Sequence, residues 1–193
     1  MFSFLDAQIK KMLLSLSNIF DFFYRTFVPV DMQIQYHLFS SPVGYLLGTV
    51  LMDKLIGLEF TDKTDLTNDN HPLFTQLKIE LTHYFQGNLK SFSIPLNPQG
   101  TAFQQNVWES LNQIPYGETR TYLQQSQILN QPKAIRAVAN ANGKNKIVIL
   151  IPCHRIIGSN GKLTGYAGGI EKKRFLLQLE QKYGDTANLF NRI

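Results

Sequence analysis

The sequence contains one cysteine and no long apolar run, and both absences restrict what the protein can be. With Cys153 alone the chain forms no internal disulfide bond, which is typical of a reducing compartment, and we expect the cytoplasm. No stretch approaches the ~20 apolar residues that a membrane helix needs. Charged residues interrupt the apolar N-terminus. We therefore expect neither a membrane span nor a secretory signal.

Patterns for metal and nucleotide binding are also missing. The candidate soft ligands, none in the paired spacing of a zinc site, are Cys153, His37, His71, His83 and His154. The glycine-containing segment 165–169 lacks the Lys-Ser/Thr pair of a phosphate loop and the context of a dinucleotide fingerprint. The sequence predicts no metal and no cofactor.

Acidic residues are scarce in the second half of the chain. Residues 1–100 carry 7 Lys and Arg against 9 Asp and Glu, whereas residues 101–193 carry 12 against 5. This asymmetry indicates that the C-terminal half faces a polyanion, although a solvated basic face would give the same count.

The first half of the chain combines a helical extension with a small α/β pattern. Within residues 1–30, apolar residues from Phe2 to Phe27 recur at helical spacing, and we expect an amphipathic helix that packs on the protein body rather than on a membrane or partner. Residues 31–97 form the expected N-terminal α/β domain. Its predicted strands span 33–39, 45–52, 56–60 and 91–96, and its predicted helix spans 72–85.

The second half, residues 98–193, is predicted to be mostly helical. The expected helices span 101–111, 121–129, 132–141 and 171–182, and a short buried strand spans 147–151. Pro132 suits the first position of its helix. The two short helices at 121–141 match a helix-turn-helix, which is weak evidence by itself because many helical hairpins bind nothing.

Cys153 follows the predicted apolar strand and precedes His154 and Arg155. A lone cysteine is usually an inert, buried side chain. Neighbouring cationic or hydrogen-bonding groups, however, lower the pKa of a thiol and expose the nucleophilic thiolate. The pattern therefore favours a reactive Cys153 without excluding an inert one.

The segment Ile151-Pro-Cys-His-Arg-Ile-Ile157 resembles the active-site signature of the 6-O-alkylguanine-DNA alkyltransferases. Five further blocks match the family in order and spacing: Phe103-Gln-Gln-Asn-Val-Trp108, Ile114-Pro-Tyr-Gly-Glu-Thr-Arg-Thr-Tyr122, Arg136-Ala-Val138, Asn142-Gly-Lys-Asn145 and Leu163-Thr-Gly-Tyr-Ala-Gly-Gly169. The resemblance is strong over about residues 98–183 and holds in outline over 32–96. It implies an α/β (α+β) fold, with an RNase H-like N-terminal domain before a winged-helix-like helix-turn-helix domain.

The resemblance also implies a mechanism of single-turnover alkyl transfer. Cys153 would accept the alkyl group from the oxygen at position 6 of guanine. His154 would act as its base through a water, and Glu180 would orient His154. Asn145 would hold the active-site turn, and Tyr122 would give a proton to guanine N3. Transfer from 4-O-alkylthymine stays open.

The implied partner is double-stranded DNA carrying an alkylated guanine, bound by a monomer through the minor groove with the base flipped out. Arg136 would fill the space left in the stack, and Tyr166 would lie over the lesion pocket. The residues expected to contact DNA or the base are Arg136, Tyr166, Arg155, Ala134, Ala137 and Lys133.

The sequence departs from the family pattern at two places near the expected site. Lys146 stands where proline is usual, and Ala139 where glycine is common. Three alternatives remain: a protein of this fold that binds alkylated bases without repairing them, a helix-turn-helix transcription regulator, and a cysteine hydrolase. The first two have no need of Cys153, and the third would turn over repeatedly.

Overall fold

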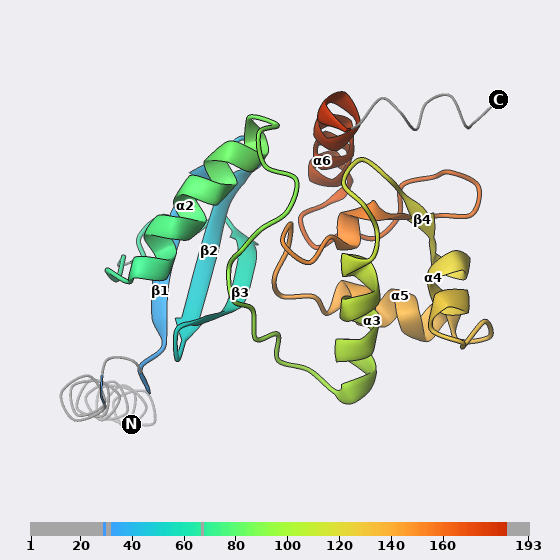
Figure 1. The fold of residues 1–193 in the computed structure, drawn as a ribbon, viewed down its shortest axis with the longest axis horizontal. Coiled ribbons are helices and arrows are strands. Elements are labelled where there is room, and N and C mark those ends of the chain that lie inside the picture. Colours follow the sequence, from blue (N-terminus) through green and yellow to red (C-terminus); the bar gives the residue numbers. More distant parts are fainter. Residues whose placement is uncertain (1–28, 30–31, 67, 185–193) are drawn as a thin grey trace, which may run out of the picture.

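The computed structural model describes residues 29, 32–66 and 68–184 of the chain. The predicted amphipathic helix over residues 2–27 lies outside this range. Figure 1 shows a sheet with one helix beside it, followed by a helical region that holds the second half of the chain. No helix in the described part is long and apolar enough to span a bilayer.

The N-terminal region is built on an antiparallel three-stranded sheet, whose strands fall at the first three segments that the sequence predicts as strands. Strands β1 (Gln35–Ser41), β2 (Gly44–Leu51) and β3 (Lys54–Thr61) follow one another in chain order. Met52 and Asp53, between β2 and β3, both have positive φ angles, 50° and 55°. That geometry belongs to a type I′ hairpin turn, whose twist matches that of the flanking strands.

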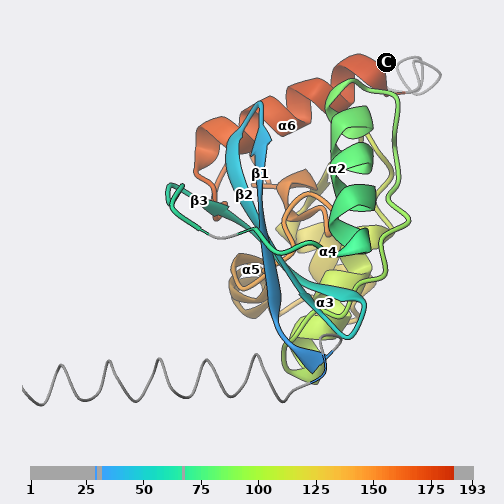
Figure 2. The same cartoon turned by 90° about the vertical axis from the view of Figure 1, so that its left-hand side faces the viewer.

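Helix α2 (Pro72–Phe85) covers one face of this sheet, with the bounds that the sequence predicts (Figure 2). Proline tolerates the first helical position because it has no N–H to satisfy there. His71 caps the helix, because its Nδ1 accepts a hydrogen bond from the Leu73 N–H at 3.1 Å. Leu77 and Leu81 are buried on the face that carries the core.

The predicted strand over residues 91–96 is wrong. Only Leu96 forms a bridge, with Leu55 of β3. The Leu55 N–H donates to the Pro95 carbonyl and the Asn97 N–H donates to the Leu55 carbonyl, each at 2.9 Å. The ladder stops there because proline has no N–H and two prolines, Pro95 and Pro98, bracket this rung.

The C-terminal region contains helices α3 (Ala102–Asn112), α4 (Tyr122–Ile128), α5 (Ile135–Gly143) and α6 (Ile170–Tyr183). Thr101 and Thr121 begin α3 and α4 with complete capping boxes, in which a glutamine three residues later closes the ring of hydrogen bonds. The sequence predicted all four helices to within a few residues.

Helix α5 begins later than predicted, because Pro132 belongs to the preceding turn. The Ala134 N–H donates to the Gln131 carbonyl at 2.8 Å, which closes a four-residue turn with proline at its second position. Proline favours that position because its fixed φ suits the turn. The helix then starts at Ile135.

Helices α4 and α5 are joined by buried side-chain amides. The Asn142 Nδ2 donates to Gln125 Oε1 at 2.7 Å, and the Gln125 Nε2 donates to Ser110 Oγ of α3 at 3.0 Å. The Trp108 indole N–H donates to the Ala141 carbonyl at 2.8 Å. These bonds satisfy polar groups that would be costly if buried alone and so fix the helix-turn-helix.

The apolar run 147–151 is not the predicted strand. Ile147 alone bridges Leu58, and the chain then turns, with Ile149 at a φ of 73°. The run is apolar because all five residues are buried, and periodicity cannot separate a buried strand from a buried turn. A β-branched residue at positive φ is a strained arrangement that costs on the order of 1–3 kcal/mol.

This turn joins the two halves of the molecule. The Leu58 N–H of β3 donates to the Lys146 carbonyl at 2.7 Å, and the Val148 N–H donates back to the Leu58 carbonyl at 3.0 Å. Beyond it, the 3₁₀-helix η2 (Cys153–Arg155) leads into β5 (Ile156–Ile157), which pairs in parallel with β4 (Arg120–Thr121). The cysteine therefore lies between the sheet and the helix-turn-helix.

Candidate active site

Cys153 is the first residue of η2 and borders a cavity. Its N–H donates to the Ile151 carbonyl at 2.8 Å, and its side chain is buried at 7% exposure. The cavity has a volume of about 250 Å³. It is lined by Tyr122, Ala139, Asn142, Gly143, Cys153, Gly165, Tyr166 and Ala167. Helix α5 and the segment before α6 thus form its walls around the sulfur.

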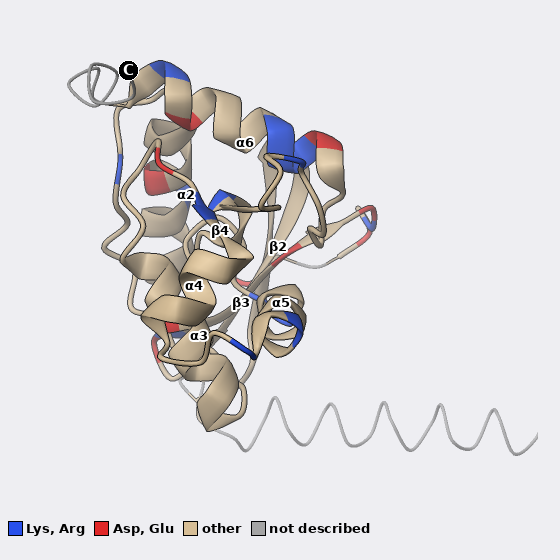
Figure 3. Cartoon of the chain, turned by 90° about the vertical axis from the view of Figure 1, so that its right-hand side faces the viewer, with Lys and Arg blue, Asp and Glu red and all other residues tan. Residues whose placement is uncertain are grey.

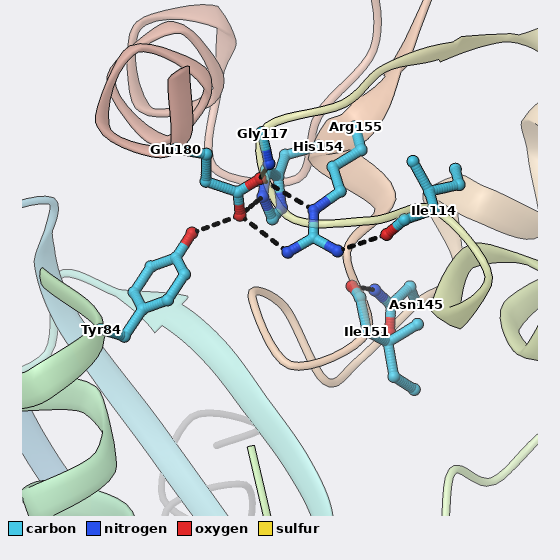
Figure 4. Close-up of polar contacts among 8 residues, drawn as sticks. All are labelled: Tyr84, Ile114, Gly117, Asn145, Ile151, His154, Arg155 and Glu180. Atoms are coloured by element: carbon cyan, nitrogen blue, oxygen red, sulfur yellow. Dashed lines mark hydrogen bonds and ion pairs between the residues drawn. The ribbon is translucent and has the colours of Figure 1, made fainter. Parts of the chain in front are cut away.

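Asn145 ties the active-site turn together from the loop after α5. Its Nδ2 donates to the Ile151 carbonyl at 2.9 Å and to the Cys153 Sγ at 3.2 Å. Its Oδ1 accepts from the Ile147 N–H at 2.9 Å, and Figure 4 shows the Asn145 bond to Ile151. An N–H aimed at sulfur favours the charged form of the thiol.

Glu180 of α6 is fully buried and receives hydrogen bonds from four residues (Figure 4). The Tyr84 hydroxyl of α2 donates at 2.8 Å, His154 Nε2 lies at 2.9 Å and the Gly117 N–H donates at 3.2 Å. Arg155 binds both carboxylate oxygens, Nε at 2.8 Å and Nη2 at 3.0 Å. Such bidentate, charge-assisted contacts hold the carboxylate as an anion.

The pKa shifts of Glu180 and His154 indicate which of the two groups is charged at neutral pH. Burial raises the pKa of Glu180, but His154 and Arg155 outweigh it and set the pKa at about 2. Burial lowers the pKa of His154 despite the adjacent carboxylate. At neutral pH His154 is therefore the neutral imidazole beside an ionised Glu180.

The Glu180 contact also fixes which ring nitrogen of His154 carries the proton. A carboxylate only accepts hydrogen bonds, so Nε2 must be the N–H that donates to it. The lone pair is then on Nδ1, which is buried and has no hydrogen-bond partner among the described residues. His154 thus presents a free basic nitrogen next to the residue that bears the thiol.

Arg155 was predicted to contact DNA, and the structure corrects this. It is 8% exposed, and its guanidinium is divided between Glu180 and the Ile114 carbonyl, to which Nη1 donates at 2.7 Å. A guanidinium engaged in a buried carboxylate pair is not available to a phosphate. Arg155 instead holds the loop before β4 against η2.

The two predicted tyrosines both lie on the cavity. Tyr122 begins α4, and its hydroxyl donates to the Thr164 carbonyl at 3.4 Å. The Tyr166 ring packs edge-on against His154 at 6.4 Å and against Phe60 of β3 at 5.7 Å between centroids. The structure therefore brings Cys153, His154, Glu180, Asn145, Tyr122 and Tyr166 together from distant parts of the sequence.

The remaining predicted residues lie on the outer side of the helix-turn-helix. Lys133, Arg136 and Ala137 are exposed, and Ala134 is half-buried. None of them lines the cavity, although Ala139 of the same helix does. Figure 3 shows basic residues on α5 and in the turn before it. Helix α5 therefore carries both an exposed cation and part of the cavity wall.

Sequence reasoning assigned no role at the site to Lys173 or to Tyr84, although Tyr84-Phe85 matched the family pattern. Lys173 occupies the buried face of α6 with Leu176 and Glu180, at the three- and four-residue spacing of a core stripe. A lysine in such a stripe is a detectable anomaly, because lysine is almost never fully buried unless paired. Tyr84 offered no comparable signal, since tyrosine is ordinary on the apolar side of a helix.

Among the described residues, no group of three or more His, Cys, Asp or Glu is placed to hold a metal ion. What the site contains is a cysteine, a neutral histidine held by a buried carboxylate, and a cavity beside a helix-turn-helix. The fold and site together are those of a class of protein in which a cysteine can act as a nucleophile beside a helix-turn-helix.

Two family models cover most of the chain. Residues 34–98 match the ribonuclease-like domain of 6-O-methylguanine DNA methyltransferase, and residues 102–182 match its DNA binding domain. The chain belongs to this family. The expected fold class, a ribonuclease-like α/β domain before a helical DNA-binding domain, is confirmed.

Curated and solved relatives agree with this assignment. The methylated-DNA–protein-cysteine methyltransferase of Methanosarcina acetivorans is 46% identical over 151 residues, 75% of this chain and 97% of the relative. The O6-methylguanine methyltransferase structure from Mycobacterium tuberculosis is 40% identical, with a TM-score of 0.73 over 82% of this chain and 99% of that one. A structure of the Mycobacterium tuberculosis protein in complex with DNA is 42% identical, with a TM-score of 0.71 over 80% and 98%.

Proposed function

We propose that this protein repairs DNA by moving an alkyl group from the oxygen at position 6 of guanine to the Sγ of Cys153. Family membership supports the reaction class. The observation that carries the assignment of the acceptor is the position of Cys153, on a cavity bordered by α4 and α5 of the helix-turn-helix. Cys153 is the one cysteine in the chain, so no other thiol competes for the role.

The reaction begins with loss of the thiol proton. The Nδ1 lone pair of His154 accepts it through a water, and Glu180 stabilises the imidazolium that results. The thiolate then attacks the alkyl carbon. A carbon–sulfur bond forms, the carbon–oxygen bond breaks, and its electron pair passes to the guanine ring.

Tyr122 neutralises the leaving group. Tyr122 lines the cavity at the start of α4, and its hydroxyl gives a proton to guanine N3 as the carbon–oxygen bond breaks. The proton that His154 took from the thiol then returns Tyr122 to its neutral form. Neutral guanine is a better leaving group than its anion. The thioether has no acidic or labile bond, so one protein molecule repairs one lesion and is spent.

DNA enters from the exposed face of α5. The cavity can take a base only when that base has left the stack, because Cys153 is buried behind the pocket walls. The small side chains of Ala134 and Ala137 allow α5 to approach the walls of the minor groove, while Arg136 occupies the space of the flipped nucleotide. Phosphate contacts from Lys133 make binding weaker as salt rises.

The test is transfer of a labelled methyl group from duplex DNA, or of a benzyl group from benzylated guanine, followed by peptide mass spectrometry. We expect one adduct per protein molecule, on the peptide that contains Cys153. Binding to the lesion with no adduct would instead indicate a protein that marks alkylated bases. Turnover beyond one group per molecule would indicate a hydrolase.

Replacing Arg136 by alanine is expected to slow repair of duplex DNA at least about tenfold while leaving benzyl transfer from the free base within about twofold. Filling the stack offsets an unstacking cost of a few kcal/mol, and that cost exists only when a base must be flipped. Single-turnover rates on both substrates measure the difference. Lys78→Ala, which removes an exposed cation from α2, is the charge-matched control. Equal losses on both substrates would refute the stack-filling role.

A further inference from the structure

Lys173 of α6 is a lysine whose side chain is fully buried. Its ammonium donates to the Ile156 carbonyl at 2.5 Å, to the Thr164 carbonyl at 2.8 Å and to the Gly165 carbonyl at 3.4 Å. Its three N–H donors are thus matched by three backbone oxygens. The charge, by contrast, has no acidic partner within ion-pair distance among the described residues.

The three carbonyls belong to two walls of the site. Ile156 follows η2 directly, so a bond to its carbonyl helps to hold the segment that carries Cys153. Thr164 and Gly165 precede Tyr166, and Gly165 lines the cavity. The Thr164 carbonyl also accepts from the Tyr122 hydroxyl. One ammonium therefore joins the acceptor segment, the cavity wall and the start of α4.

A buried cation without a carboxylate is expensive unless another negative charge forms nearby. Burial lowers the pKa of Lys173 to about 8, and the charge of an ionised Cys153 acts in the opposite direction. The pKa of Cys153 shows the reciprocal pattern: burial raises it, whereas the Asn145 hydrogen bond and then Lys173 lower it.

The other groups that face Cys153 cannot supply a positive charge to stabilise its thiolate. His154 is neutral, and Tyr122 and Tyr166 have pKa values raised by burial and stay uncharged at neutral pH. Arg155 is neutralised by Glu180. Among the described residues around the thiol, Lys173 is the cation whose charge is not already paired.

We propose that Lys173 is a positioning residue of the alkyl-transfer site, which clamps Ile156 to the Thr164–Gly165 wall and supplies the positive charge opposite which Cys153 ionises. This inference rests on the proposed role of Cys153 as acceptor. Lys173 thus stabilises the thiolate by its charge, in addition to the removal of the thiol proton by His154. Transfer to the sulfur removes the negative charge and leaves the Lys173 ammonium unopposed in the protein interior.

The test is titration of the thiolate by its ultraviolet absorbance, with Cys153→Ser subtracted to remove the tyrosine signal. In Lys173→Met we expect the titration to move to higher pH, and the iodoacetamide reaction at pH 7 to slow about tenfold, since a tenfold change in thiolate corresponds to one pKa unit. Lys173→Gln keeps an N–H donor but not the charge and should behave like Lys173→Met. Lys173→Arg keeps the charge and should restore most of the reactivity.

Arg174→Met, which removes an exposed cation from the next position of α6, is the matched control and should leave the titration unchanged. Circular dichroism establishes that each variant is folded. An unchanged thiolate titration in folded Lys173→Met would overturn the proposal. So would a shift in Lys173→Met that Lys173→Arg fails to reverse, because that result assigns the effect to packing.

A reciprocal measurement needs no Lys173 variant. Nuclear magnetic resonance of labelled lysine Nζ follows the titration of Lys173 in the unaltered protein and in Cys153→Ser. Loss of the thiolate should lower the pKa of Lys173, and identical titrations would contradict the coupling. Neither readout involves DNA, so a protein that failed to repair DNA could still pass this test, and the two failures are distinguishable.

Discussion

Cys153→Ala is expected to reduce alkyl transfer to background while leaving DNA binding within about twofold of the original protein. The substitution removes the one sulfur, and no other cysteine can replace it. The basic surface of α5 and of the turn before it is untouched, because Arg136 and Lys133 do not line the cavity that holds Cys153. Transfer of labelled methyl and binding to undamaged duplex DNA measure the two effects separately.

A matched control for this substitution is Ser159→Ala, which changes a similarly small side chain on an exposed segment a short distance along the chain. It should preserve transfer. Residual transfer by Cys153→Ala, with label recovered on another residue, would show that the acceptor has been wrongly assigned. Loss of DNA binding together with transfer would show instead that the substitution had disturbed the fold.

Glu180→Gln is expected to lower the free energy of unfolding by about 3–5 kcal/mol, the range for breaking one partner of a buried ion pair. Glutamine keeps the shape of glutamate but leaves the Arg155 guanidinium buried without a counter-charge. It also cannot fix the His154 tautomer, because its amide both donates and accepts. Alkyl transfer should therefore fall more than about tenfold, and urea unfolding at pH 7 gives the stability change. Glu171→Gln, at an exposed position of the same helix, is the control.

The pH dependence of stability gives a second readout of the same substitution. The pKa of Glu180 is about 2 in the folded protein against an ordinary 4.5, so its contribution is fully present above pH ~4.5 and is lost as pH falls toward 2. The difference corresponds to about 3 kcal/mol. Stability of the original protein should fall over this window, and Glu180→Gln should lack that part of the fall. Parallel curves would contradict the assigned pKa.

The elements with strong local signals were predictable. Strand β2 alternates in burial, helix α2 carries a proline at its first position, and α3 and α4 carry capping boxes. The failures lie where burial overrides local pattern. The apolar run 147–151 is a buried turn, and Pro132 serves a β-turn rather than a helix start.

The candidate site could be predicted only in part from individual residues. The lone Cys153 and the neighbouring His154 suggested a nucleophile, but Glu180 entered through the family resemblance, because 26 positions separate it from His154. The prediction that Arg155 contacts DNA failed because the sequence shows the charge of this residue but not that it pairs with the Glu180 carboxylate. Lys173 was missed because a charged side chain usually lies on the protein surface, whereas this one lies on the buried face of α6.

Two hydrogen bonds join Leu58 to the residues on either side of Ile147. Because of them, the active-site turn keeps its shape only while the two halves of the protein stay in contact. At its other edge, β3 forms a single bridge with the segment that precedes Cys153. The amide protons of Leu58 and Val148 should then exchange with solvent together, and only when the halves of the protein separate. When the contact between Leu58 and the segment around Ile147 is broken, the cavity beside Cys153 is not formed. A protease that cleaves this open state therefore removes only molecules that are unable to repair DNA.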